Sequence, residues 1–251
     1  MKKMTRVQRK KRRRRIFLRI MLLVSLLFII FILALKTEFF LIDNIKVMGN
    51  KKLIAKTIID ASNIEKKDNI FKISIKNSEK AIEELPYIKE VKIKRKLPKA
   101  LIINVVERKG ALQIKNISSY IILDKEGYIL DIVSDKNNKF TELIGFHIEN
   151  KVPGDNLFLD LEQFNANFIE EGENLNLLSQ MEEINLLDDN NINILLLNGI
   201  DVAFGTIDNV KYKLSLLKEV LRDIEKKDLQ CKMILMDRGE NPIIVLEDEE
   251  G

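Results

Sequence analysis

Residues 16–35 form a run of 20 residues, IFLRIMLLVSLLFIIFILAL, in which Arg19 is the only charged residue. An α-helix of this length is about 30 Å long, which matches the hydrocarbon core of a bilayer. An arginine one turn inside the run can extend its guanidinium toward the lipid headgroups. The run therefore predicts a transmembrane helix at 16–35, so the remaining chain must fold as a separate body beside a membrane.

The charge that flanks this run predicts its orientation. Residues 1–15 carry ten Lys or Arg and no acidic residue. Basic flanks of a membrane span stay on the cytoplasmic side. We therefore expect a single-pass type II protein of the cytoplasmic (inner) membrane, with its N-terminus inside and its C-terminal part extracytoplasmic. A cleaved signal peptide is the alternative, but it has a shorter apolar core and a small-residue cleavage site, and the segment that ends the run, ALKTEFF, offers no clear one.

The basic stretch RKKRRRR at residues 9–15 also fits a nucleic-acid-binding arm. Its position beside an apolar span favours a topology signal that contacts anionic lipid instead. We expect a membrane contact here and no nucleic-acid partner.

The residue types available for catalysis are few. Cys231 is the only cysteine, which excludes an intrachain disulfide, and His147 is the only histidine. The sequence contains no nucleophile elbow, zinc-protease motif, phosphate loop or dinucleotide-binding motif. Acidic pairs such as Glu170-Glu171 are adjacent in sequence, so their side chains splay apart or face solvent. We therefore predict no catalytic residue, no metal and no cofactor, and we favour a binding or scaffolding role.

Residues 40–109 predict a small α+β domain. Alternating apolar residues at 45–47, 88–94 and 101–107 indicate strands, and helical spacing indicates two helices, one at 53–61 and one that Pro86 stops. The order is β-α-α-β-β, which fits two helices packed on one face of a sheet. The lysine-rich stretch at 89–96 is interpreted as the solvated face of a strand, with a specific anionic partner as the open alternative.

Residues 110–247 predict a mostly antiparallel β domain with flanking helices. Turn residues at 124–127 and 198–199 indicate hairpins. Residues 211–224 form an amphipathic helix, whereas 160–180 are polar and indicate a helix only weakly. The predicted strands are Tyr120–Leu123, Tyr128–Val133, Asn193–Leu197, Ile200–Phe204, Met233–Met236 and Ile243–Leu246.

One stretch resembles a known family. RKLPKALIINVVER at 95–108 resembles the Arg-x-x-Pro-x-x-Leu-x-Ile-x-Val-x-Glu-Arg end of the POTRA domain in the bacterial cell-division proteins FtsQ and DivIB. Asn69-Ile-Phe71, Leu123-Asp124-x-x-Gly127 and Asn198-Gly199 are similar to other segments of that family. The residues that match the first motif are Arg95, Pro98, Leu101, Ile103, Val105, Glu107 and Arg108.

The patterns above and the resemblance together divide the chain into five expected regions. They are a basic cytoplasmic tail (1–15), a transmembrane helix (16–35), a POTRA domain (40–109), an FtsQ/DivIB-type β domain (110–247) and an acidic C-terminal tail (248–251).

The resemblance also implies a function. The family is non-enzymatic, lies at the division septum and binds FtsB/DivIC-like and FtsL-like proteins in the divisome, where it helps regulate septal peptidoglycan synthesis. The expected partner-binding residues are those of the last strand, Ile243, Ile244, Val245 and Leu246, because a sheet edge can accept a strand from a partner.

Two other functions stay open. One is a POTRA-type envelope chaperone or secretion component. The other is a membrane-anchored wall hydrolase, which needs convergent carboxylates, for which Glu107 and Asp124 are the residues to test.

Overall fold

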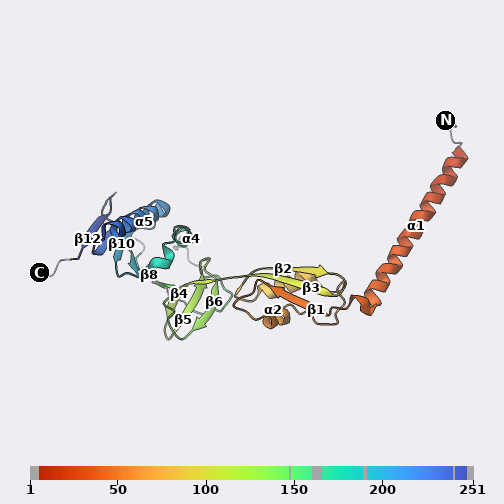
Figure 1. Ribbon diagram of the computed structural model, residues 1–251, viewed down its shortest axis with the longest axis horizontal. Helices are drawn as coiled ribbons and strands as arrows, with labels where there is room; N and C mark the ends of the chain where they lie inside the picture. The colour runs from red at the N-terminus through yellow and green to blue at the C-terminus, as the bar shows by residue number, and fades with distance from the viewer. Residues whose placement is uncertain (1–5, 147, 160–165, 189–190, 240, 248–251) are drawn as a thin grey trace. The chain divides into compact units, whose positions relative to one another are not determined.

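The computed structural model describes residues 6–146, 148–159, 166–188, 191–239 and 241–247 (Figure 1). His147, residues 160–165 and the predicted acidic tail at 248–251 lie outside the described residues. The chain divides into two compact units. The first comprises residues 1–83 and 90–106, and the second comprises residues 84–89 and 107–251.

The chain begins with helix α1 (Arg6–Lys36), which contains the predicted span, and a 3-10 turn, η1 (Glu38–Phe40), follows it. Among the described residues, no helix is both long enough and apolar enough to cross a membrane. The side chains at positions 31, 34 and 35 are outside the described set. The transmembrane helix at 16–35 stays a prediction.

The first unit has the predicted β-α-α-β-β order. Its elements are β1 (Asn44–Met48), α2 (Ala55–Ala61), α3 (Ile75–Glu83), β2 (Ile88–Lys96) and β3 (Ala100–Glu107). The sheet order is β1-β3-β2, and β1 runs parallel to β3.

The core of the first unit follows from the apolar alternation. Ile45 pairs with Leu101 and Val47 with Ile103, on one face of the sheet. The same unit buries Ile58 of α2 and Ile82 of α3 completely. A turn at Gly49 follows β1 with φ +93, and a Cβ there would lie 2.0 Å from the Val105 carbonyl oxygen. Only glycine fits this close approach in the left-handed region.

The second unit is built on one nine-stranded sheet. Its order is β12-β11-β10-β9-β8-β7-β4-β5-β6. Five neighbouring pairs are antiparallel and three are parallel, so the prediction of a mostly antiparallel sheet is confirmed. The strands are β4 (Gly110–Asn116), β5 (Ser119–Asp124), β6 (Ile129–Val133), β7 (Thr141–Ile144), β8 (Met181–Asn185), β9 (Ile192–Leu196), β10 (Asp201–Gly205), β11 (Cys231–Leu235) and β12 (Ile243–Leu246).

Helices pack on this sheet. They are α4 (Ala166–Asn174), the short η2 (Leu178–Gln180) and α5 (Val210–Lys227). Figure 1 shows α5 lying along the strands at the C-terminal end of the sheet. The predicted stripe on α5 enters the core through Leu214, Leu217 and Ile224. Strands β4, β7 and β8 were not predicted from the sequence, and α4 shows that the polar stretch at 160–180 does contain a helix.

Candidate functional site

The last strand, β12, lies at one end of the nine-stranded sheet. In the described chain its only strand neighbour is β11, to which it runs antiparallel, with Ile244 opposite Ile234 and Ile243 opposite Leu235. Its four residues, IIVL, include no charge. The predicted partner-binding residues therefore form a strand whose outer edge carries no further strand of the described chain.

The hydrogen-bonding direction of each β12 residue can be assigned. The Glu247 N–H donates to the Gln230 carbonyl at 2.9 Å, so Glu247 faces β11. Successive peptide groups in a strand point to opposite edges. The pairing with β11 shifts register between Cys231 and Met233, but beyond the shift the Met236 N–H donates to Ala203 of β10, so Leu235 and Met233 face β12. Their partners Ile243 and Val245 therefore face β11, while Ile244 and Leu246 direct their N–H and C=O groups to the outer edge. These are the groups that an added strand would bond.

Side chains of β12 alternate between the two faces of the sheet. Ile244 packs against the core beside Ile234, whereas Ile243 and Val245 lie on the opposite face and are 47% and 37% exposed. Leu246, on the same face as Ile244, is 49% exposed. An apolar strand with an open edge and three exposed side chains is the kind of surface that other chains pair with.

At the opposite end of the same sheet, a loop covers the outer edge of β6 at its first residue. There the N–H of Ile129 in β6 donates to the Asp155 carbonyl, and its C=O accepts from the Gly154 N–H, both at 2.8 Å. A loop of the chain therefore occupies the first edge position of β6. In the three-stranded sheet the edge strand β2 carries several lysines, which oppose edge pairing. Among these edges, β12 is the one with an apolar strand and open main-chain groups.

The motif residues at 95–107 have structural roles in and around β2 and β3. The Arg95 guanidinium donates to the carbonyls of Ile70 at 2.7 Å and Ile73 at 3.0 Å, which fixes the segment before α3. Pro98 follows a cis peptide bond in the β2–β3 turn. Leu101 is fully buried in the core, and Glu107 ends β3 half-buried. None of these residues belongs to the sheet that contains β12.

Arg108 is the centre of an ion cluster in the second unit. Its Nη1 donates to Asp124 Oδ2 at 2.7 Å and to Glu126 Oε2 at 3.0 Å. Its guanidinium also lies 3.5 Å from the centre of the Tyr128 ring. The side chains of Arg108 and Asp124 are only 10% and 6% exposed. Lys89 adds an exposed ion pair to Glu126.

Backbone hydrogen bonds complete this cluster. Asp124 Oδ1 accepts from the N–H groups of Glu126 and Tyr128 at 3.0 and 2.9 Å, which shapes the β5–β6 turn. The Arg108 N–H donates to the Tyr87 carbonyl at 2.8 Å. The cluster therefore joins the segment at 84–89, the segment at 107–108 and the first hairpin of the sheet into one structure.

The electrostatics of the cluster are those of a structural ion network. Burial lowers the pKa of Arg108, but the hydrogen bonds and charges of Asp124 and Glu126 outweigh it and raise that pKa. The hydrogen bond from Lys89 lowers the pKa of Glu126, against desolvation, with help from Arg108. Nearby, burial and the Asp131 carboxylate raise the pKa of Tyr87 to about 12. The shifts of Arg108 and Glu126 both favour the ionised form of the side chain, as expected in a structural ion network.

The Arg108 cluster was missed from the sequence, although Arg108 and Asp124 were each quoted in a family motif. Their separation of 16 residues gives no pattern that a local reading can detect. An ion pair could have been suggested by the residue types alone, because Arg108 ends one motif and Asp124 begins a hairpin turn.

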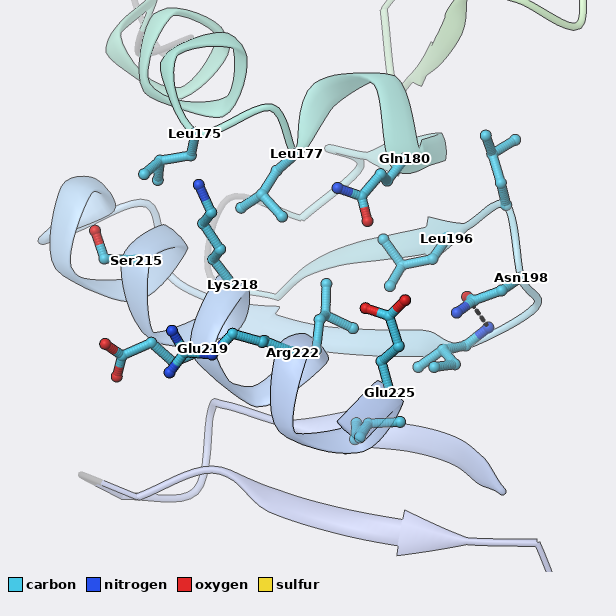
Figure 2. A pocket seen from close by; sticks show the side chains of 14 residues that line it. Leu175, Leu177, Gln180, Leu196, Asn198, Ser215, Lys218, Glu219, Arg222 and Glu225 are labelled. Carbon is cyan, nitrogen blue, oxygen red and sulfur yellow. Dashed lines mark hydrogen bonds between the residues drawn. The ribbon is translucent and has the colours of Figure 1, made fainter. Parts of the chain in front are cut away.

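The second unit also contains a cavity of about 800 Å³ between α5, the β9–β10 hairpin and the segment that leads to η2 (Figure 2). Leu175, Leu177 and Leu196 supply apolar walls, while α5 contributes Lys218 and Arg222 along with acidic side chains. Among the described residues, no group of three or more His, Cys, Asp or Glu side chains could hold a metal ion.

Comparisons with known proteins agree with this architecture. Residues 40–108 match the family model described as POTRA domain, FtsQ-type. Residues 111–236 match the model described as cell division protein FtsQ/DivIB, C-terminal. The two matches cover the three-stranded sheet and most of the nine-stranded sheet, and they end before β12.

Relatives match over most of the chain. This chain is 32% identical over 245 residues to "Cell division protein DivIB" of Clostridium botulinum, and the aligned region covers 95% of this chain and 94% of the relative. It is 29% identical over 223 residues to the DivIB protein of Clostridium tetani, covering 86% and 78%. A solved extracytoplasmic domain of DivIB from Geobacillus stearothermophilus matches 48% of this chain and 96% of its own, at 14% identity and a TM-score of 0.30. The chain belongs to the FtsQ/DivIB family of bacterial cell-division proteins.

Proposed function

We propose that this chain is a non-catalytic divisome scaffold that binds an FtsB/DivIC-like protein, and with it an FtsL-like protein, through the outer edge of β12. The observation that carries the proposal is the uncharged strand Ile243–Leu246 at the end of the sheet, with its outward main-chain groups unpaired within the described chain. A partner strand would bond Ile244 and Leu246 and cover the exposed side chains of Ile243 and Val245.

The proposed setting is the cytoplasmic membrane at the division septum. The apolar run at 16–35 would anchor the chain, with the tail at 1–15 in the cytoplasm and the folded units outside. Most described side chains of that run are exposed on α1, for example Leu22 and Phe28, and such a surface is normally covered by lipid or protein. The proposed regions are a POTRA domain at 40–109, a β domain at 110–247 and an acidic tail at 248–251.

The scaffold would act by bringing its partners together, and through them it would help regulate septal peptidoglycan synthesis. The names of the relatives support a role in cell division and favour it over an envelope chaperone or secretion component. A wall hydrolase that uses Glu107 and Asp124 has less support, because Asp124 is already held by Arg108 and by two backbone N–H groups.

A paired substitution at position 246 tests the edge proposal. Leu246→Pro removes an outward N–H, and proline is tolerated where a strand N–H faces away from the sheet. Leu246→Ala truncates the same side chain but keeps the N–H. Losing one intermolecular hydrogen bond and leaving a partner carbonyl unpaired costs about 1–3 kcal/mol, which corresponds to about 5- to 150-fold weaker binding.

The assay is co-purification from membranes of dividing cells, with the bound chains identified by mass spectrometry. The proposal expects an FtsB/DivIC-like chain with the native protein and the Leu246→Ala variant, and its loss with Leu246→Pro. Val245→Pro provides the folding control, because it removes an N–H that faces β11 and should loosen β12 itself. Full retention of the partner by Leu246→Pro would rule out strand addition at this edge.

A further inference from the structure

The three-stranded sheet of the first unit has one face that its helices do not cover. Ile45, Val47, Leu101 and Ile103 point to the helix-covered face, so the alternate residues of β1 and β3 point to the open face. There Lys46 lies opposite Ile102 in the pairing of β1 with β3. The open face is therefore accessible, and its composition decides what can bind it.

The open face is lined by lysines. In β2 the Arg95 side chain reaches the carbonyls of Ile70 and Ile73, which belong to the helix-covered side. Lys92, Lys94 and Lys96 alternate with Arg95 and project from the other face. Together with Lys46 and Lys99 they make five exposed lysines, and within the described chain none of the five forms an ion pair.

A shallow hollow of about 270 Å³ lies at one end of this face. Lys46, Lys96 and Lys99 line it, with Ile102 and Pro98 among the apolar walls, and Asp43 is its one acidic residue. Leu97 sits between two of these lysines in the sequence and is 56% exposed. Cationic side chains around an exposed apolar residue suit the boundary between lipid headgroups and acyl chains.

The positive charge is local. Residues 40–108 contain 16 Lys or Arg against 9 Asp or Glu, whereas residues 111–236 contain 12 against 22. A uniformly basic protein would give the same face by chance, but of these two ranges only 40–108, the one that follows α1, has an excess of basic residues. Lysine ammonium groups bind phosphate as point charges.

We propose that the open face of the β1-β3-β2 sheet binds the phosphate groups of anionic phospholipids, with Lys46, Lys92, Lys94, Lys96 and Lys99 as the contacting residues. The location of the lipid rests on the proposed anchor at 16–35. Six residues lie between the end of α1 at Lys36 and Asp43 at the hollow, and the seven Cα-to-Cα steps that this makes reach at most about 25 Å. The face is therefore tethered close to a bilayer surface.

A tryptophan placed beside the hollow gives a specific probe, since the chain contains no tryptophan. The full chain with Leu97→Trp is incorporated into nanodiscs of phosphatidylcholine alone or with about one third phosphatidylglycerol, each doped with a dansyl lipid. Energy transfer from Trp to dansyl measures how closely the face approaches the lipid. Ile132→Trp, at an exposed position of the second unit, is the matched reporter.

The proposal expects at least twofold more energy transfer from position 97 in anionic than in neutral nanodiscs. Replacing Lys92, Lys94 and Lys96 with Gln should abolish this difference in energy transfer between the two kinds of nanodisc. The control replaces three exposed lysines elsewhere in the first unit with Gln, namely Lys66, Lys72 and Lys76. This control changes the net charge equally and should preserve the difference in energy transfer. About 1 M salt should remove the difference as well, because it shortens the screening length to about 3 Å.

Equal transfer in the two lipids, or an undiminished difference in the Lys92/Lys94/Lys96 variant, would overturn the proposal. Binding to soluble polyphosphate without any lipid dependence would also overturn it and would indicate a phosphate-rich polymer instead. Incorporation into neutral nanodiscs tests the anchor separately. If the chain fails to incorporate, the anchor is wrong, and co-sedimentation of the two triple-Gln variants with phosphatidylglycerol vesicles then decides whether the face binds lipid.

Discussion

Replacing Arg108 with methionine should destabilise the second unit strongly. Met fills a similar volume without the charge, so Asp124, which is 6% exposed, loses its cation. Breaking a buried pair from one side costs about 3–5 kcal/mol, and the contact with Tyr128 adds about 0.5–2 kcal/mol. The N–H groups of Glu126 and Tyr128 still bond Asp124 and reduce this cost. We expect a net loss of about 2–4 kcal/mol.

Amide hydrogen exchange along β5 measures this loss, because those amides report the opening of the second unit alone. The exchange of the β5 amides in Arg108→Met should be about 30- to 700-fold faster, because each 1.4 kcal/mol lost corresponds to a factor of about ten. Lys89→Gln is the control, since its ion pair to Glu126 is more than a third exposed and such pairs contribute about 0–1 kcal/mol. If Arg108→Met quickened exchange no more than Lys89→Gln does, the buried cluster would not stabilise the unit as argued.

Two further predictions concern the stability of the two units. The pKa of Glu126 is lowered, chiefly by the hydrogen bond from Lys89, so ionised Glu126 stabilises the folded state above the ordinary carboxyl pKa, and this contribution is lost as the pH falls through the lowered pKa. The β5 amides should therefore exchange at different rates in the native chain and in Glu126→Gln near neutral pH, and this difference should disappear in acid. A difference that persists in acid would contradict the assignment. Gly49→Ala should lower the free energy of unfolding of the first unit by at least about 1–3 kcal/mol, because φ is +93 and the new Cβ would meet the Val105 carbonyl. Gly154→Ala is the control, because its Cβ would have nothing within 4 Å, and urea denaturation should show a smaller loss for it. Equal losses in the two variants would argue against the close approach.

Local periodicity was enough to predict much of this fold. The alternating residues of β2 and β3 and the stripe on α5 bury one face each, so their pattern is visible in the sequence. Strands β7 and β8 were not predicted, because polar residues interrupt their apolar pattern and, in β7, are buried with partners outside the strand. Thr141 donates to the carbonyls of Leu178 and Met181, and Glu142 pairs with Lys136 at 2.8 Å. Buried polar residues of this kind hide the apolar pattern of a strand.

The candidate site was only partly predictable for a related reason. The sequence indicated a strand at 243–246, but its place at the end of the sheet depends on the order of eight other strands. The direction of its peptide groups depends on its pairing with β11 and on hydrogen bonds such as that from Glu247 to Gln230. Neither property can be recognised from the four residues themselves, so the prediction that they bind a partner depended on the family resemblance.

Residue-resolved amide exchange of β12, with and without the co-purified FtsB/DivIC-like partner, tests the central claim most directly. In the unbound chain, the N–H groups of Val245 and Glu247 should exchange slowly, because they face β11, and those of Ile244 and Leu246 should exchange fast. Binding by strand addition predicts that Ile244 and Leu246 become protected in the complex. A bound partner that leaves both amides exchanging at their unbound rates would contradict the proposal that β12 is the docking strand.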